Sequence, residues 1–124
     1  MSFWMKSGVV IEDLECFKIT CEKLGVSLEE NTELAKRSRS GNDVKYTLRD
    51  PAGGTACLVH YKGGFRLEGD TDSSLLRRLR GGQEITRSYA EETIRKFARS
   101  NRMSITGRKV QEDGRIVLRA CVGY

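Results

Sequence analysis

The chain has 124 residues, of which 38% are hydrophobic and 31% are charged, and its formal net charge is +5. This balance excludes a disordered chain, and the length suits one domain, so we predict a single domain over residues 1–124. No apolar run reaches the roughly 18 to 20 residues of a membrane helix, and the first residues lack a secretory signal, so we expect a cytoplasmic protein without membrane contact.

The first quarter of the chain predicts a strand followed by a helix. The β-branched run in Ser7–Ile11 predicts a short strand. The acidic residues Glu12 and Asp13 suit the start of a helix, and Gly25 suits its end. Between them lies one apolar stripe at helical spacing: Leu14, Phe17, Cys21 and Leu24. Val26–Arg37 is ambiguous, because Ser27–Glu30 resembles a capping box but also suits an edge strand.

The middle of the chain predicts an antiparallel meander. Val44–Leu48 alternates apolar and polar residues, which is typical of a half-buried strand. Thr55–Tyr61 and Phe65–Glu68 are two further strands. The turns between them carry Pro and Gly, and another turn is expected at Ser38–Asn42.

The second half predicts a short helix at Leu75–Leu79, a long helix at Glu84–Arg102 and a terminal hairpin. The candidate buried face of the long helix consists of Ile85, Tyr89, Ile94, Phe97 and Ala98. The hairpin is expected to pair Met103–Gln111 with Arg115–Val122 around Asp113-Gly114, a dipeptide that favours a type I′ turn.

These elements together predict an α+β fold, an antiparallel sheet with two main helices on one face. A helix followed by a hairpin occurs at Glu12–Leu48 and again at Glu84–Val122, which suggests two similar halves that build one sheet. The predicted architecture is therefore a two-layer sandwich.

The excess of positive charge lies entirely in residues 63–124, which carry 13 basic and 8 acidic side chains. Arg95, Arg99 and Arg102 follow helical spacing along one face of the long helix. The candidate anion-binding or partner-binding residues are Arg77, Arg78, Arg80, Arg87, Arg95, Arg99 and Arg102. Arginine suits contacts with phosphate or carboxylate groups. The alternative interpretation is a solvated helix face with ion pairs such as Glu91–Arg95.

The sequence gives little support for a catalytic site or a metal site. His60 is the only histidine, and it lies in a predicted strand without an orienting partner. Cys16, Cys21, Cys57 and Cys121 lack the spacing of zinc ligands, so we expect reduced thiols. The paired glycines match no phosphate-binding loop. We therefore predict a protein that is not an enzyme and has no cofactor or metal.

Two large apolar residues, Phe3 and Trp4, lie outside any periodic element. They either cover one end of the core or form a contact between subunits of a homo-oligomer.

Both ends of the chain resemble an uncharacterised family. The pattern Tyr89-Ala90 followed by a hairpin with Glu112-Asp113-Gly114, and the helix that ends in Lys23-Leu24-Gly25-Val26, are similar to the hypothetical chloroplast reading frame thirty-five family, whose members occur in plastids, cyanobacteria, other bacteria and phages. The middle of the chain departs from that pattern. The resemblance implies a compact α+β domain of cytosolic or viral origin, without a known cofactor.

The sequence thus predicts a non-catalytic binding protein whose Arg-rich second half contacts a polyanion such as nucleic acid, or an acidic protein. The alternative is a protein that binds or sequesters a small anionic ligand such as a nucleotide, with Arg side chains in a pocket.

Overall fold

The computed structural model describes residues 3–31 and 37–122, which form an α+β fold as the sequence predicts. Along the chain the elements are β1 (Trp4–Lys6), α1 (Leu14–Lys23), β2 (Ser27–Glu30), β3 (Val44–Arg49), β4 (Thr55–Tyr61), β5 (Gly64–Asp70), α2 (Ser74–Arg78), α3 (Gln83–Ser100), β6 (Met103–Val110) and β7 (Ile116–Val122).

Five strands form one antiparallel sheet in the order β1-β5-β4-β3-β2. The central strands β3, β4 and β5 are successive neighbours, which confirms the predicted meander. The ambiguous segment contributes β2 as an edge strand, while residues 32–36 of that segment lie outside the described part of the chain. Both edges resist pairing with another chain, because β1 has only three residues and β2 carries Glu29 and Glu30.

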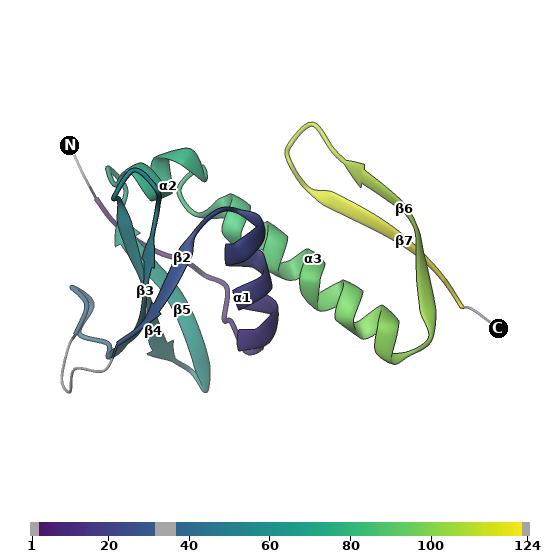
Figure 1. The fold of residues 1–124 in the computed structure, drawn as a ribbon, viewed down its shortest axis with the longest axis horizontal. Helices are drawn as coiled ribbons and strands as arrows, with labels where there is room; N and C mark the ends of the chain where they lie inside the picture. The colour runs from purple at the N-terminus through teal and green to yellow at the C-terminus, as the bar shows by residue number, and fades with distance from the viewer. Residues whose placement is uncertain (1–2, 32–36, 123–124) are drawn as a thin grey trace.

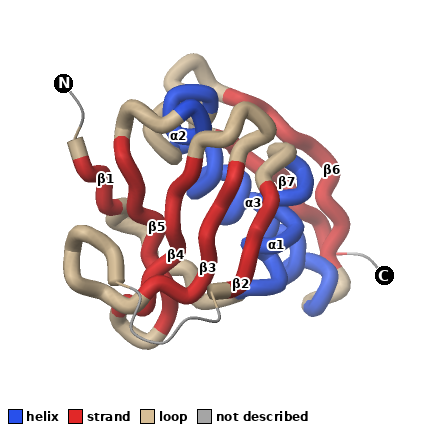
Figure 2. The backbone as a smooth tube through the Cα atoms, turned by 60° about the vertical axis from the view of Figure 1, so that its left-hand side comes forward, coloured by secondary structure: helices blue, strands red, loops and turns tan. Residues whose placement is uncertain are grey.

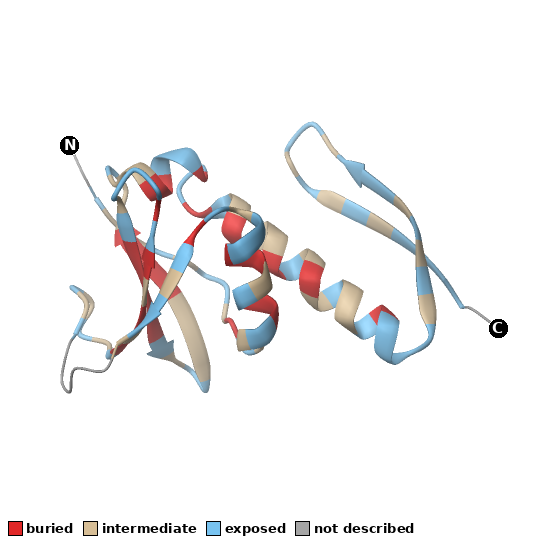
Figure 3. Cartoon of the chain, viewed as in Figure 1, coloured by how far each residue is buried: buried red, intermediate tan, exposed pale blue. Residues whose placement is uncertain are grey.

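The helices α1 and α3 lie on one face of this sheet, and α2 lies at one end of it (Figure 1). The main core fills the space between helices and sheet; among its fully buried members are Phe17, Leu48, Leu58, Leu67, Leu75 and Ile85. Figure 3 shows the buried residues concentrated in the sheet and in the parts of the helices next to it. The apolar stripe of α1, the alternating buried residues of β3 and the buried centre of β4 thus meet in one core.

The ends of α1 follow from local chemistry. Asp13 caps the helix, because its side chain accepts the backbone N–H of Cys16 at 3.1 Å. Lys96 of α3 also donates to Asp13 at 2.8 Å, and this hydrogen bond lowers the pKa of the Asp13 carboxyl. At the other end, Gly25 adopts a φ of 70°, a conformation in which glycine avoids steric strain. The predicted limits of this helix are confirmed.

The terminal hairpin does not join the main sheet. β6 and β7 pair only with each other, and they lie on the side of α3 away from the sheet (Figure 1). The predicted antiparallel sheet with two main helices on one face is confirmed. The expectation that two similar halves build a single sheet is wrong, because the hairpin forms a two-stranded sheet of its own. α3 is 18 residues long and extends beyond the sheet, so the returning hairpin packs against the helix alone.

Three local predictions also differ from the structure. The first strand is β1 rather than Ser7–Ile11. Between these residues the Val9 N–H bonds to the Ser7 hydroxyl at 3.1 Å instead of to β5, and of the predicted strand only Ile11 forms a bridge, with Phe65. In α3, Ile94 and Phe97 were predicted to be buried but are 48% and 63% exposed. At about 100° per residue, Ile94 lies on the opposite side of the helix from the buried Ile85.

The hairpin turn is longer than the predicted type I′ turn. Gln111 donates its N–H to the carbonyl of Arg115, so three residues lie between the closing pair. Only Gly114 of these three has a positive φ, whereas a type I′ turn requires two such residues.

Candidate functional site

The second face of the main sheet is not covered by α1 or α3, as Figure 2 shows with the strands in front and the helices behind. Strand register decides which side chains point to this face. Cys57 of β4 lies between Thr47 of β3 and Glu68 of β5, and Trp4 lies opposite Asp70. Because side chains alternate along a strand, these residues share the face opposite the main core.

A buried carboxylate, that of Glu68 in β5, lies on this open face. Glu68 has no exposed surface, yet each of its oxygens accepts hydrogen bonds. The donors are Trp4 Nε1 at 2.9 Å, Ser40 Oγ at 2.7 Å and Arg66 Nη2 at 2.8 Å. Burial by itself raises the pKa of Glu68, but the hydrogen bonds outweigh it and lower the pKa to about 2. Glu68 is therefore a charged anchor that ties β1 and the loop before β3 to β5.

The loop before β3 crosses the open face above Glu68. It is a turn in which Gly41 donates its N–H to the carbonyl of Ser38 at 2.9 Å. Gly41 has a φ of 85°, which explains the glycine at this position. Ser40 and Asn42 point down to Glu68. The buried carboxylate thus fixes a polar loop that would otherwise have little to pack against.

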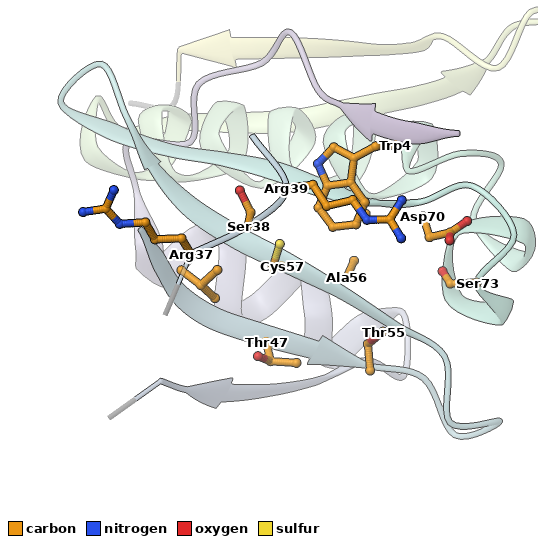
Figure 4. A pocket seen from close by; sticks show the side chains of 12 residues that line it. Trp4, Arg37, Ser38, Arg39, Thr47, Thr55, Ala56, Cys57, Asp70 and Ser73 are labelled. Carbon is orange, nitrogen blue, oxygen red and sulfur yellow. The ribbon is translucent and has the colours of Figure 1, made fainter. Parts of the chain in front are cut away.

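A pocket of about 310 Å³ lies between this loop, the sheet and β1 (Figure 4). It is lined by Trp4, Arg37, Ser38, Arg39, Val44, Thr47, Thr55, Ala56, Cys57, Gly69, Asp70 and Ser73. The size is at the lower end of the range for small-molecule pockets, which is about 300 to 1,000 Å³.

Two guanidinium groups occupy opposite parts of the pocket rim. Arg39 extends along Trp4 in Figure 4, with its Cζ 5.4 Å from the centre of the indole ring. Arg37 stands at the far end, and Figure 4 shows its guanidinium directed away from the other lining residues. It pairs with Asp43 at 3.6 Å, both side chains being about two-thirds exposed. Such an exposed pair is weak and leaves Arg37 able to bind another anion.

The remaining polar groups of the lining can give and accept hydrogen bonds. Thr47, Thr55 and Ser73 bring hydroxyls, and the Asp70 carboxylate is an acceptor on the rim. The site therefore suits a molecule that has an anionic group for the arginines and an N–H donor for Asp70. His60 lies elsewhere, against the ring of Phe65 at 5.1 Å. Among the described residues, no group of three or more potential metal ligands lies together.

The arginines predicted from the sequence do not line this pocket. In the first group, Arg78 is tied to the buried carboxylate of Asp50 at 2.7 Å. Arg77 and Arg80 are exposed and form looser pairs, with Asp72 at 3.3 Å and Glu84 at 3.5 Å. Arg78 thus has a structural partner, whereas the other two pairs contribute little.

The second group of predicted arginines lies along α3 and beyond it. Arg95 pairs with Glu91 at 3.6 Å, as the i,i+4 spacing predicts. Arg87 packs against the hairpin turn, where a methyl group on Gly114 would collide with its guanidinium. Arg99 is exposed in the last turn. Arg102 follows the end of α3 with a φ of 55°, so it does not continue the helical face as the spacing predicts.

The two groups do not converge. Arg80 precedes the start of α3 and Arg102 follows its end, and a helix of 18 residues is about 27 Å long. A single basic patch built from all seven arginines is therefore not formed by this fold.

Sequence reasoning missed the residues that build the pocket. Arg37 and Arg39 lie in a half of the chain without net charge, and Glu68 is one acid in a short predicted strand. Trp4 was the one available signal, since it is a large apolar residue outside any periodic element. The structure places it on the open face, whereas Phe3 remains 64% exposed.

No family model matches the chain, and no curated protein or solved structure matches it either. The similarity to the chloroplast reading frame family therefore stays a prediction. Within the described residues, no helix is both long and apolar enough to cross a membrane.

Proposed function

We propose that this protein is a non-catalytic binding protein that holds a small anionic ligand of the nucleotide class in the pocket on the open face of the sheet. The observation that carries the proposal is the position of Arg39 beside Trp4, on a loop that the buried Glu68 anchors. A fixed cation beside an aromatic ring suits a ligand with an anionic group and a planar group.

The polar lining narrows the ligand class. Arg37 and Arg39 supply charge for a phosphate or carboxylate, and the hydroxyls of Thr55 and Ser73 supply further donors. Asp70 favours a ligand that also carries an N–H donor, as the amino groups of nucleobases do. The pocket volume of about 310 Å³ favours a single small molecule over a long polyanion.

Trp4 provides a direct measurement, because it is the only tryptophan in the chain. Titration with nucleoside monophosphates should change the Trp4 fluorescence and raise the melting temperature of the full-length protein. The variant Arg39→Gln should lose most of this response. Arg99→Gln is the matched control, because it removes the same charge from an exposed residue outside the pocket.

A panel of nucleotides that leaves both fluorescence and melting temperature unchanged at millimolar concentration would overturn the proposal. An equal loss of response in Arg39→Gln and Arg99→Gln would also overturn it, because it would trace binding to net charge rather than to the pocket.

A further inference from the structure

The helix α3 and the β6–β7 hairpin together form a unit that we call the distal unit, residues 83–122. It carries nine basic and five acidic side chains, for a net charge of +4, whereas residues 1–82 carry a net charge of only +1. Within the described chain, five of the nine basic side chains of this unit form no salt bridge with a carboxylate: Arg87, Arg99, Arg102, Lys109 and Arg119. The distal unit is thus the basic part of the molecule.

The outer edge of β7 lacks the features that normally keep strand edges from pairing. Its sequence is Ile-Val-Leu-Arg-Ala-Cys-Val, with one charge and no proline, and no described strand pairs with its second edge. The partner strand β6 is protected, because it has a bulge between Ile105 and Gly107 and carries Arg108 and Lys109. A long apolar edge with open N–H and C=O groups can accept an additional strand.

Apolar side chains of the distal unit are also incompletely covered. Val117 and Val122 of β7 are 47% and 55% exposed, and Ile94 and Phe97 of α3 are 48% and 63% exposed. No residue of β6 or β7 reaches the buried class. A two-stranded hairpin is marginally stable in water by itself, and a third strand would stabilise it.

We propose that β7 binds an acidic segment of another protein, which adds to the hairpin in extended conformation as a third strand. Main-chain hydrogen bonds to the open edge would supply affinity, and alternate side chains would supply specificity. The positive charge of the distal unit selects an acidic segment, and Arg119 faces it from the middle of the strand.

A second copy of the chain fits this edge less well. Arg119 is the central residue of β7, so symmetric antiparallel pairing centred on the strand would place two arginines opposite each other, which is unfavourable. A nucleic acid would satisfy the arginines, but its phosphates cannot continue the ladder of N–H and C=O groups. An acidic strand can both pair with the positive charge of the distal unit and form hydrogen bonds with the open N–H and C=O groups of β7.

The test uses the full-length protein and two labelled synthetic peptides, one of alternating Glu and Val and the other of alternating Lys and Val. Fluorescence anisotropy should show binding of the acidic peptide and none of the basic one. Hydrogen exchange should show slower exchange of the amides in β7 when the acidic peptide binds. Arg119→Glu should lower the affinity for the acidic peptide by about tenfold or more. Val117→Glu, at a second exposed position of the strand, should lower this affinity as well.

Arg77→Glu is the matched control, since it makes the same change of net charge on an exposed residue of α2. An equal loss of peptide affinity in Arg77→Glu and Arg119→Glu would overturn the proposal. Slower hydrogen exchange of amides outside the hairpin on peptide binding would overturn it as well. Sedimentation of the free protein as a dimer with protected β7 amides would assign the edge to a second copy instead. Binding of labelled nucleic acid that depends on Arg119, without binding of the acidic peptide, would assign the surface to nucleic acid.

Discussion

The indole N–H of Trp4 donates to the carboxylate of Glu68 at 2.9 Å, across 64 positions of the sequence. This hydrogen bond joins β1 to the neighbouring strand β5 on the open sheet face, and the same carboxylate holds the loop that carries Arg39. The binding pocket that we propose therefore depends on a single buried charge.

We predict that Glu68 makes the protein more sensitive to acid. Its folded pKa of about 2 lies below the ordinary value of 4.5, so its contribution to stability is complete above about pH 4.5 and is lost as the pH falls toward 2. The shift corresponds to about 3 kcal/mol. Urea unfolding at several pH values should show a steeper loss for the wild type than for Glu68→Gln. Parallel pH profiles of the two proteins would contradict the prediction.

We predict that Trp4→Phe lowers the free energy of unfolding by about 1 to 3 kcal/mol, because a charged acceptor loses a buried donor. The pKa of Glu68 should rise in this variant, since one of the hydrogen bonds that lower it is gone. Circular dichroism during urea unfolding provides the measurement. Phe3→Leu, at a position that is 64% exposed, is the control and should have little effect.

We predict that Tyr89→Phe lowers the free energy of unfolding by a comparable amount. The Tyr89 hydroxyl oxygen accepts the backbone N–H groups of Glu12 and Asp13, each at 3.0 Å, and so ties α3 to the start of α1. Removal of the oxygen leaves two donors without their acceptor, at a cost of about 1 to 3 kcal/mol. Thermal unfolding measures the change. Tyr61→Phe is the control, and an equal loss in both variants would show that the two N–H groups are not the cause.

We predict that two adjacent arginines of α2 differ in their effect on stability. Arg78 neutralises the buried Asp50 carboxylate at 2.7 Å, whereas Arg77 makes an exposed contact at 3.3 Å. Burial raises the pKa of Asp50, and the hydrogen bond from Arg78 is among the contacts that lower it below its ordinary value.

Arg78→Gln should therefore lower the urea midpoint clearly, while Arg77→Gln should leave it almost unchanged. Equal midpoints for these two variants would mean that Arg78 has no greater structural role than its neighbour.

Local patterns in the sequence determined much of the secondary structure. The capped apolar stripe of α1, the alternation in β3, the strand β4 and the long helix α3 were all predicted, because propensity, side-chain period and capping act over a few residues. The α+β class follows from these elements, and it is confirmed.

The candidate pocket depends on contacts that the sequence does not reveal. Trp4, Arg39 and Glu68 are far apart along the chain, and they meet only because β1 and β5 are neighbours in the sheet and the loop before β3 folds over them. No local period relates such positions. The arginine pattern was visible in the sequence, but its division between the two ends of α3 was not.

The place of the hairpin was likewise decided by tertiary structure. Its two strands were predicted from their own residues, yet nothing local to Met103–Val122 specifies which surface they pack against. α3 extends past the edge of the core, so the returning strands meet the helix rather than the sheet. The sequence thus determined the elements and their charges, because these depend on neighbours along the chain. Tertiary packing alone decided which faces remained open for binding, because that depends on contacts between distant segments.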